Sequence, residues 1–81
     1  MPEPTENLIA EHDLEEIRGA LEELRDEHRQ VLLLRFVGGM SSEEVGESLG
    51  KSAGAVRIQQ MRALEALRLQ LETKRLEEDS G

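Results

Sequence analysis

The stretch Ser41–Arg62 constrains the fold more than any other part of this chain. It reads SSEEVGESLGKSAGAVRIQQMR. Ser41 can cap a short helix, and Glu44, three residues later, can complete a capping box. Gly50 lies where that helix must end and the chain must reverse, and Ser52 can cap a second, longer helix. Two helices joined by a tight turn are typical of a helix-turn-helix, whose second helix enters the major groove of DNA.

The charge distribution supports a nucleic-acid partner although the net charge is -8. Residues 1–50 carry a net charge of -9, residues 51–75 carry +4, and residues 76–81 carry -3. An even coat of acids would repel phosphate. An ordinary solvated helix is the alternative, but this asymmetry favours a charged partner for the positive block. The bases of the positive block are Lys51, Arg57, Arg62, Arg68, Lys74 and Arg75.

Composition limits the class of fold. The 81 residues suffice for one small domain, and with Phe36 as the single aromatic residue the core must be aliphatic. Cysteine is absent, which excludes disulfides and thiolate metal sites. We see no signal peptide and no apolar run near the ~20 residues that span a bilayer, so we expect a cytoplasmic protein without a membrane partner. No segment alternates with period two. We therefore predict an all-α fold, a compact four-helix domain that contains a helix-turn-helix and no strands.

The segment boundaries follow from the same patterns. Residues 1–7 read as a flexible tail or a linker remnant, and residues 76–81 as a charged flexible tail. Residues 8–75 form the helical domain, with the helix-turn-helix at about residues 41–71. Its last helix should run from Ala53 to beyond Leu71.

The first half of the domain is predicted to hold two amphipathic helices. The helical pattern begins at Leu8 and breaks near residues 25–26, where Asp26 can cap a second helix that ends at Val37, before Gly38–Gly39. The apolar positions of the first helix are Leu14, Ile17, Leu21 and Leu24. Its acidic outer face holds Glu11, Asp13, Glu15, Glu16, Glu22 and Glu23. We expect the apolar positions of residues 21–34 and 45–71 to share one core.

The last helix has two distinct faces when residues are placed at 100 degrees per step from Val56. The side predicted to be buried holds Val56, Gln60, Ala63, Leu64, Leu67 and Leu71. The side predicted to be exposed holds Arg57, Ile58, Met61, Arg62, Glu65, Arg68 and Leu69. Arginine can bond a guanine edge or a phosphate, and an apolar side chain can contact a thymine methyl group. Gln59, on one flank, can reach a phosphate or an adenine.

These considerations give two sets of candidate residues. The candidate DNA-binding residues are Lys51, Ser52, Ala53, Arg57, Ile58, Gln59, Met61 and Arg62. The candidate protein-binding residues are Ile58, Met61, Leu69 and Leu76. Single exposed apolar residues are common, but these four lie along one face of one helix.

Catalysis is not expected. His12 and His28 lie in different predicted helices, each among acids. Glu43 and Glu44 are adjacent and so point about 100 degrees apart on a helix, which prevents them from converging on one substrate. We expect no catalytic residues, no metal site and no cofactor, and therefore no enzyme.

The residues from Leu21 to Leu71 resemble region 4 of a bacterial sigma factor of the extracytoplasmic-function group. The GAVRIQQMRAL segment is most similar to actinobacterial members of the SigD type. Gly46 departs from the family pattern, which has alanine there, and Ile58 and Gln59 replace a serine and a basic residue. The matching pieces are Leu24, Arg29, Leu32–Arg35, Gly39, Ser41, Glu44–Gly46, Gly54–Val56, Arg62–Ala63 and Leu67–Arg68.

The resemblance implies a domain that docks on the -35 promoter element and on the flap of the RNA polymerase beta subunit. It also implies control by an anti-sigma factor that covers these surfaces. A complete sigma factor of this group has a further domain for the -10 element, so we expect the chain to be part of a longer protein. Two alternatives stay open: a protein-interaction module bound mainly by an anti-sigma factor, and a stand-alone helix-turn-helix repressor, which would need a dimerising surface.

Overall fold

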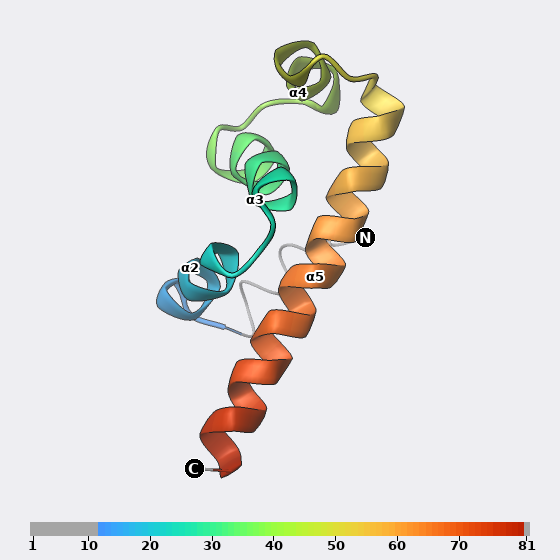
Figure 1. Ribbon diagram of the computed structural model, residues 1–81. Helices are drawn as coiled ribbons and strands as arrows, with labels where there is room; N and C mark the ends of the chain where they lie inside the picture. Colours follow the sequence, from blue (N-terminus) through green and yellow to red (C-terminus); the bar gives the residue numbers. More distant parts are fainter. Residues whose placement is uncertain (1–11, 81) are drawn as a thin grey trace, which may run out of the picture.

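The fold is organised around one long helix. The computed structural model describes residues 12–80. Figure 1 shows α5 (Ala53–Ser80) running the length of the molecule, with α2 (Leu14–Glu22), α3 (Asp26–Leu32) and α4 (Ser42–Leu49) following one another along one side of it. A π-helical turn, η1 (Leu33–Val37), extends α3. Residues 12–80 contain no strand, so the all-α helical prediction is confirmed.

The core forms two clusters along α5, where the sequence predicted one. The first joins α2, α3 and the middle of α5 through Ala20, Leu24, Leu32, Ala63, Leu64, Leu67 and Leu71. The second joins α3, α4 and the start of α5 through Val31, Val45 and Val56. Val31 and Leu32 are consecutive residues of a helix, so their side chains point about 100 degrees apart and enter different clusters.

Helix α2 begins and packs differently from the sequence prediction. Asp13 is its N-cap and accepts a hydrogen bond from the Glu16 N–H at 2.8 Å. Ala20 is fully buried, whereas Leu14, predicted to lie on the buried side, is 75% exposed. Leu14, six residues before Ala20, lines an open groove between α2, the α3–η1 segment and α5. The predicted start of the helical pattern at Leu8 lies outside the described residues.

Helix α3 is not capped by Asp26. The N-cap is Arg25, whose side chain makes no capping hydrogen bond within the described residues. Asp26 is the first helical residue and pairs with Arg29 one turn later. An acid in the first turn still favours the helix, because it lies near the positive end of the macrodipole. The prediction of a helix start at this place was right, but the capping residue was wrong.

The α3–η1 segment ends at Val37, as the sequence predicted. In η1 the Gly38 N–H donates to the Leu33 carbonyl oxygen at 2.8 Å, a wider turn than an α-helix has. Gly39 has φ 68°, a left-handed conformation that favours glycine. The pair of glycines therefore ends the helix and turns the chain toward α4.

Helix α5 is longer than expected. It begins at Ala53 and passes Leu71 as predicted, and then continues to Ser80. Residues 76–80, assigned to a charged tail from the sequence, are thus part of the helix, and the flexibility of that tail stays a prediction. Among the residues that the structure describes, no helix is long and apolar enough to cross a membrane.

Candidate nucleic-acid interface

The first helix of the predicted helix-turn-helix is fixed by a complete capping box. The Ser41 hydroxyl accepts from the Glu44 N–H at 3.1 Å, and the Glu44 carboxylate accepts from the Ser41 N–H at 3.0 Å. Hydrogen bonds from Ser41, first of all from its backbone N–H, lower the pKa of Glu44 below its ordinary value. Both bonds satisfy N–H groups that have no partner inside the helix.

The turn between α4 and α5 depends on two glycines. Gly50 has φ 71° and ψ 36°, the left-handed conformation expected for a helix stop. The Lys51 N–H donates to the Gly46 carbonyl oxygen at 2.8 Å, which folds the turn back onto α4. A Cβ atom on Gly46 would lie 2.4 Å from the Lys51 carbonyl oxygen. The alanine usual in the family pattern would therefore force the turn away from α4.

Helix α5 begins at the predicted cap. The Ser52 hydroxyl accepts from the Ala55 N–H at 3.1 Å. One turn later the fully buried Val56 packs with Val45 of α4 and Val31 of α3. Capping fixes where α5 starts, and the valine cluster fixes its rotation, so the opposite face of its first turns points to solvent.

Arg35 fixes the start of α5 further, and the sequence analysis gave it no role. Its Nε donates to the Gln60 side-chain oxygen at 2.9 Å, and its Nη1 donates to the Met40 carbonyl oxygen at 2.7 Å. The guanidinium also lies 5.4 Å from the centre of the Phe36 ring. One half-buried side chain thus joins η1, the loop before α4 and helix α5. In the sequence, the available signal for this contact was Gln60, a polar residue on the side of α5 predicted to be buried.

The exposed face of α5 agrees with the helical-wheel prediction. Arg57, Ile58, Met61 and Arg62 are all exposed within its first three turns. Lys51 and Ser52 are exposed just before the helix, and Ala53 is half-buried. The buried positions of the wheel, from Val56 to Leu71, are also as predicted, with Gln60 half-buried.

Gln59 differs from the other candidates. It is half-buried, and its side-chain carbonyl oxygen is buried without a hydrogen-bond partner among the described residues. In this conformation the oxygen does not face solvent. A contact of Gln59 with a phosphate or an adenine stays a prediction that would require its side chain to turn.

A contact that the sequence analysis missed connects α4 with the exposed face of α5. The Arg57 Nη2 donates to the Glu43 carboxylate at 2.8 Å, across 14 residues of sequence. Helical periodicity does not determine how closely residues of two different helices approach each other. This pair could therefore hardly be predicted from the sequence.

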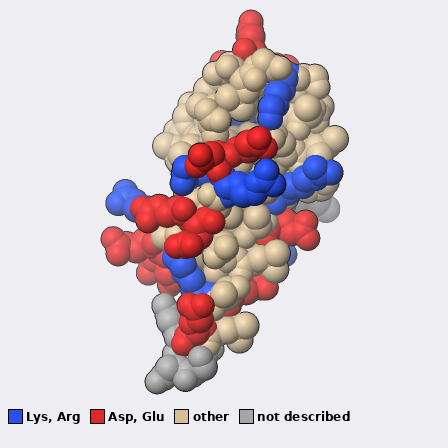
Figure 2. Space-filling model, viewed as in Figure 1, with Lys and Arg blue, Asp and Glu red and all other residues tan. Residues whose placement is uncertain are grey.

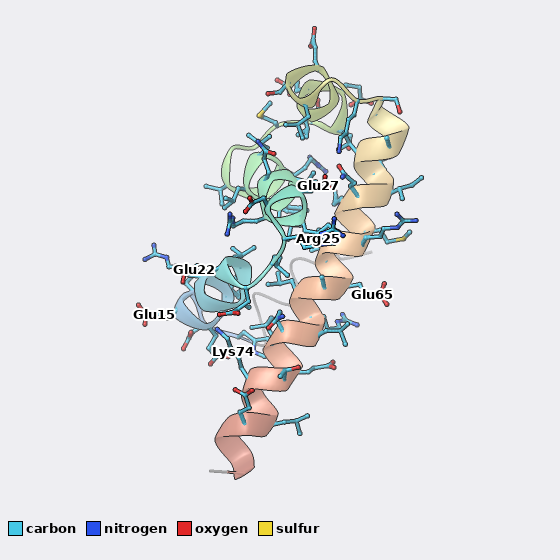
Figure 3. All side chains as sticks on the ribbon, in the orientation of Figure 1. Glu15, Glu22, Arg25, Glu27, Glu65 and Lys74 are labelled. Carbon is cyan, nitrogen blue, oxygen red and sulfur yellow. The ribbon has the colours of Figure 1, made fainter. Side chains whose placement is uncertain are left out.

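The electrostatic surface is mixed. Figure 2 shows Lys and Arg side chains in a broken band across the middle of the side in view, with acidic side chains above, beside and below it. Figure 3 shows Glu65 pointing away from α2, α3 and α4, on the outer side of α5. Basic and acidic side chains are therefore interspersed on the side in view.

The structure contains an apolar groove that the sequence analysis did not identify. It lies between α2, the α3–η1 segment and α5, and has a volume of about 620 Å³. Leu14 and Val37, 75% and 78% exposed, line it together with Ile17, Leu33 and Phe36. Three apolar side chains that the local pattern predicted to be buried, Leu14, Ile17 and Leu33, thus lie together at one open surface.

A cation crosses from α5 to α2 beyond this groove. Figure 3 shows Lys74 pointing toward α2, on the side where Glu15 and Glu22 lie. Its ammonium group occupies the space above Gly19, where a Cβ atom would lie 2.7 Å from the Nζ. Further out, Leu69 and Leu76 of α5 are each more than half exposed.

Comparison with known proteins places these features in a family. Residues 20–69 match the family described as sigma-70, region 4. The chain is 40% identical over 65 residues to the ECF RNA polymerase sigma factor ShbA of Streptomyces griseus, covering 80% of this chain and 34% of that protein. It is 37% identical over 65 residues to SigD of Mycobacterium tuberculosis (80% and 31%) and 34% identical over 74 residues to SigX of Bacillus subtilis (91% and 38%). The chain thus spans about a third of the length of these relatives.

Proposed function

Because this chain belongs to the sigma-70 region 4 family, we propose that it recognises the -35 promoter element and directs RNA polymerase to transcription start sites. The observation that most supports this proposal is the exposed start of α5, which is held by the capped turn on one side and by the Val31–Val45–Val56 cluster on the other. A helix held in this way can enter a major groove without changing its own packing. The proposal concerns recognition and not catalysis, and it places the protein in the cytoplasm.

The proposed contacts divide into positioning and reading. Lys51, Ser52 and Ala53 lie at the N-terminus of α5, whose free backbone N–H groups favour a phosphate. Arg57 is the proposed base reader, with Ile58 and Met61 beside it to contact thymine methyl groups. Arg62, five residues after Arg57, is the proposed phosphate contact, and Gln59 is a proposed flanking contact.

A DNA titration tests this division. Duplexes selected from a random library with the unaltered chain supply the preferred sequence. We expect Arg57→Ala to weaken binding to that sequence by about 1–3 kcal/mol and to relax preference at one position. We expect Arg62→Ala to weaken all sequences alike and to reduce the salt slope by about 1. Arg18→Ala, an equal loss of charge on α2, is the control. The α5 face is not the reader if Arg57→Ala and Arg62→Ala both bind like the control.

The apolar groove is the proposed docking surface for the flap of the RNA polymerase beta subunit. Leu14, Leu33 and Val37 expose apolar area that a partner helix would bury, while the DNA-facing side of α5 stays free. Val37→Glu should weaken binding to a purified flap and leave DNA binding unchanged. Leu76→Glu makes the same change at an exposed residue that is not among the groove-lining residues, and should leave flap binding intact. Equal effects of the two variants would reject the groove.

An anti-sigma factor is the second proposed protein partner. Ile58, Met61, Leu69 and Leu76 form an exposed apolar series along α5, and the last two lie beyond the turns assigned to DNA. A partner that buried this series would also cover Arg57 and Arg62, so it would compete with DNA without a change of fold. Leu69→Glu should weaken an anti-sigma complex far more than DNA binding. A stable ternary complex with promoter DNA would reject competition.

Two alternatives are separated by simple measurements. If the domain binds an anti-sigma factor tightly and selected DNA not at all, the protein-interaction module is the better description. A stand-alone repressor would read paired half-sites as a dimer, so sedimentation of a monomer at working concentration would count against it.

A further inference from the structure

The ion pair between Arg57 and Glu43 joins the two helices of the proposed DNA-reading unit. Glu43 lies in the first turn of α4 and Arg57 in the second turn of α5, and the Nη2 to carboxylate distance is 2.8 Å. The pairs His12–Glu16 and Asp26–Arg29, by contrast, each connect residues within about one turn. Arg57 is thus restrained by a different helix from its own.

Stability does not account for this pair. The Arg57 and Glu43 side chains are 61% and 66% exposed. Exposed pairs of this kind contribute little to folding, because solvent screens the attraction and two long side chains lose rotamer freedom. The fold already holds α4 against α5 through the buried Val45 and Val56. The contact should therefore act mainly on the orientation and the effective charge of Arg57.

The geometry leaves Arg57 able to read a base. A guanidinium has five N–H donors, and Glu43 accepts from Nη2. Nη2 has a second N–H, and this N–H, those of Nη1 and that of Nε are the donors that remain for guanine O6 and N7. Arg57 can therefore keep its contact with Glu43 and still make a bidentate contact with guanine.

The negative charge of Glu43 weakens the attraction of Arg57 for phosphate. Non-specific DNA binding depends on cationic charge, because each phosphate contact releases counterions. Glu43 offsets the charge of Arg57 and so reduces its attraction for backbone of any sequence. Arg62, on the same exposed face, has no ion-pair partner among the described residues and keeps its full attraction.

We propose that Glu43 is a specificity-positioning residue: it orients Arg57 toward a base edge and suppresses its binding to phosphate. This inference rests on the proposed promoter recognition and deepens it. It assigns Arg57 to sequence reading and Arg62 to phosphate binding on the basis of their different acidic surroundings.

Three variants test the contact of Glu43 with Arg57 and control for the loss of charge. Glu43→Asp keeps the charge on a side chain one methylene shorter, so contact with Arg57 is lost. Glu43→Gln removes the charge. Glu47→Gln removes an equal charge from an exposed residue of the same helix that makes no hydrogen bond or ion pair with Arg57. Thermal melting checks that each variant is folded.

The measured quantity is the ratio of dissociation constants for a scrambled duplex and for the duplex selected with the unaltered chain, at fixed salt. We expect Glu43→Asp and Glu43→Gln to lower this ratio about three- to tenfold, as expected for freeing one long side chain. Glu47→Gln should tighten both duplexes alike and leave the ratio unchanged. With Arg57→Ala already present, Glu43→Asp should have no further effect. An unchanged ratio in both Glu43 variants would overturn the proposal.

A second measurement works without DNA. The heteronuclear NOE of the Arg57 Nε–Hε group reports its fast motion. We expect a restrained group in the unaltered chain and in Glu47→Gln, and a mobile one in both Glu43 variants. If the unaltered chain selects no duplex, promoter recognition fails, and this measurement still decides whether Glu43 positions Arg57. Equal mobility in all four proteins would refute the positioning role.

Discussion

The adjacent residues Leu32 and Leu33 give the sharpest test of the core. They are the same amino acid in consecutive positions, but Leu32 is 4% exposed and Leu33 is 40% exposed. Leu32 packs in the cluster that joins α3 to α5. Leu33 lines the open groove. Replacing each by alanine removes the same atoms, so the difference in effect measures burial alone.

The expected magnitudes are well separated. Leu32→Ala removes buried aliphatic groups and leaves a cavity that α3 and α5 cannot close, for a loss of about 2–5 kcal/mol. Leu33→Ala removes partly solvated groups and should lose about 1 kcal/mol or less. Domains of this size have a total stability of about 4–12 kcal/mol, so the first variant loses a large share of it and the second does not.

Thermal unfolding followed by far-ultraviolet circular dichroism makes the comparison. Each kcal/mol lowers the Tm of a domain of this size by about 4–8 °C. We therefore expect a fall of about 8–40 °C for Leu32→Ala and of less than about 8 °C for Leu33→Ala. Urea titration gives the free energies directly. Equal falls for the two variants, or a larger one for Leu33→Ala, would show that the assignment of these leucines is wrong.

Three further predictions address the turn, the arginine anchor and the cap. Gly50→Ala should lose about 1–2 kcal/mol in urea unfolding, because alanine is strained at φ 71°. Arg35→Lys should destabilise the domain and weaken DNA binding, since lysine lacks the fork that reaches both Gln60 and a carbonyl oxygen; unchanged DNA binding would contradict its positioning role. The lowered pKa of Glu44 stabilises the fold above the unfolded-state pKa of about 4.3, and this contribution disappears as pH falls through the folded pKa. The stability deficit of Glu44→Gln should therefore narrow in acid, whereas Glu47→Gln, outside the capping box, should show no such trend from capping.

The helix-turn-helix could be predicted well because its determinants are local. The Ser41–Glu44 capping box, the left-handed Gly50 and the Ser52 cap each involve residues within a few positions of one another. The face of α5 was also predictable, since helical periodicity fixes which residues share a side. These features depend on residues close together in the sequence, so local rules are enough to predict them.

The features that could not be predicted depend on which residues of other helices lie opposite them in the folded domain. Periodicity placed Leu14 on the apolar side of α2, but α2 packs on α5 through Ala20 and leaves Leu14 at an open groove. The Arg57–Glu43 pair and the Arg35–Gln60 bond span 14 and 25 residues, and no local rule sets the approach of those side chains. Asp26 was a reasonable cap by residue type, yet the helix starts one residue earlier than a cap at Asp26 requires.

Under the proposed function, the acidic charge of the chain has a physical consequence for how specificity arises. A domain with a net charge of -8 gains little from general attraction to phosphate, so its own affinity for DNA should be weak. Docking of the groove on polymerase would hold α5 beside the promoter and raise its effective concentration there, which supplies affinity without new DNA contacts. The exposed face of α5 then has only to discriminate between sequences. Pairing of Arg57 with Glu43 suits a domain in which polymerase supplies affinity and α5 supplies specificity. The pairing reduces the attraction of Arg57 for phosphate and leaves N–H donors for a base edge.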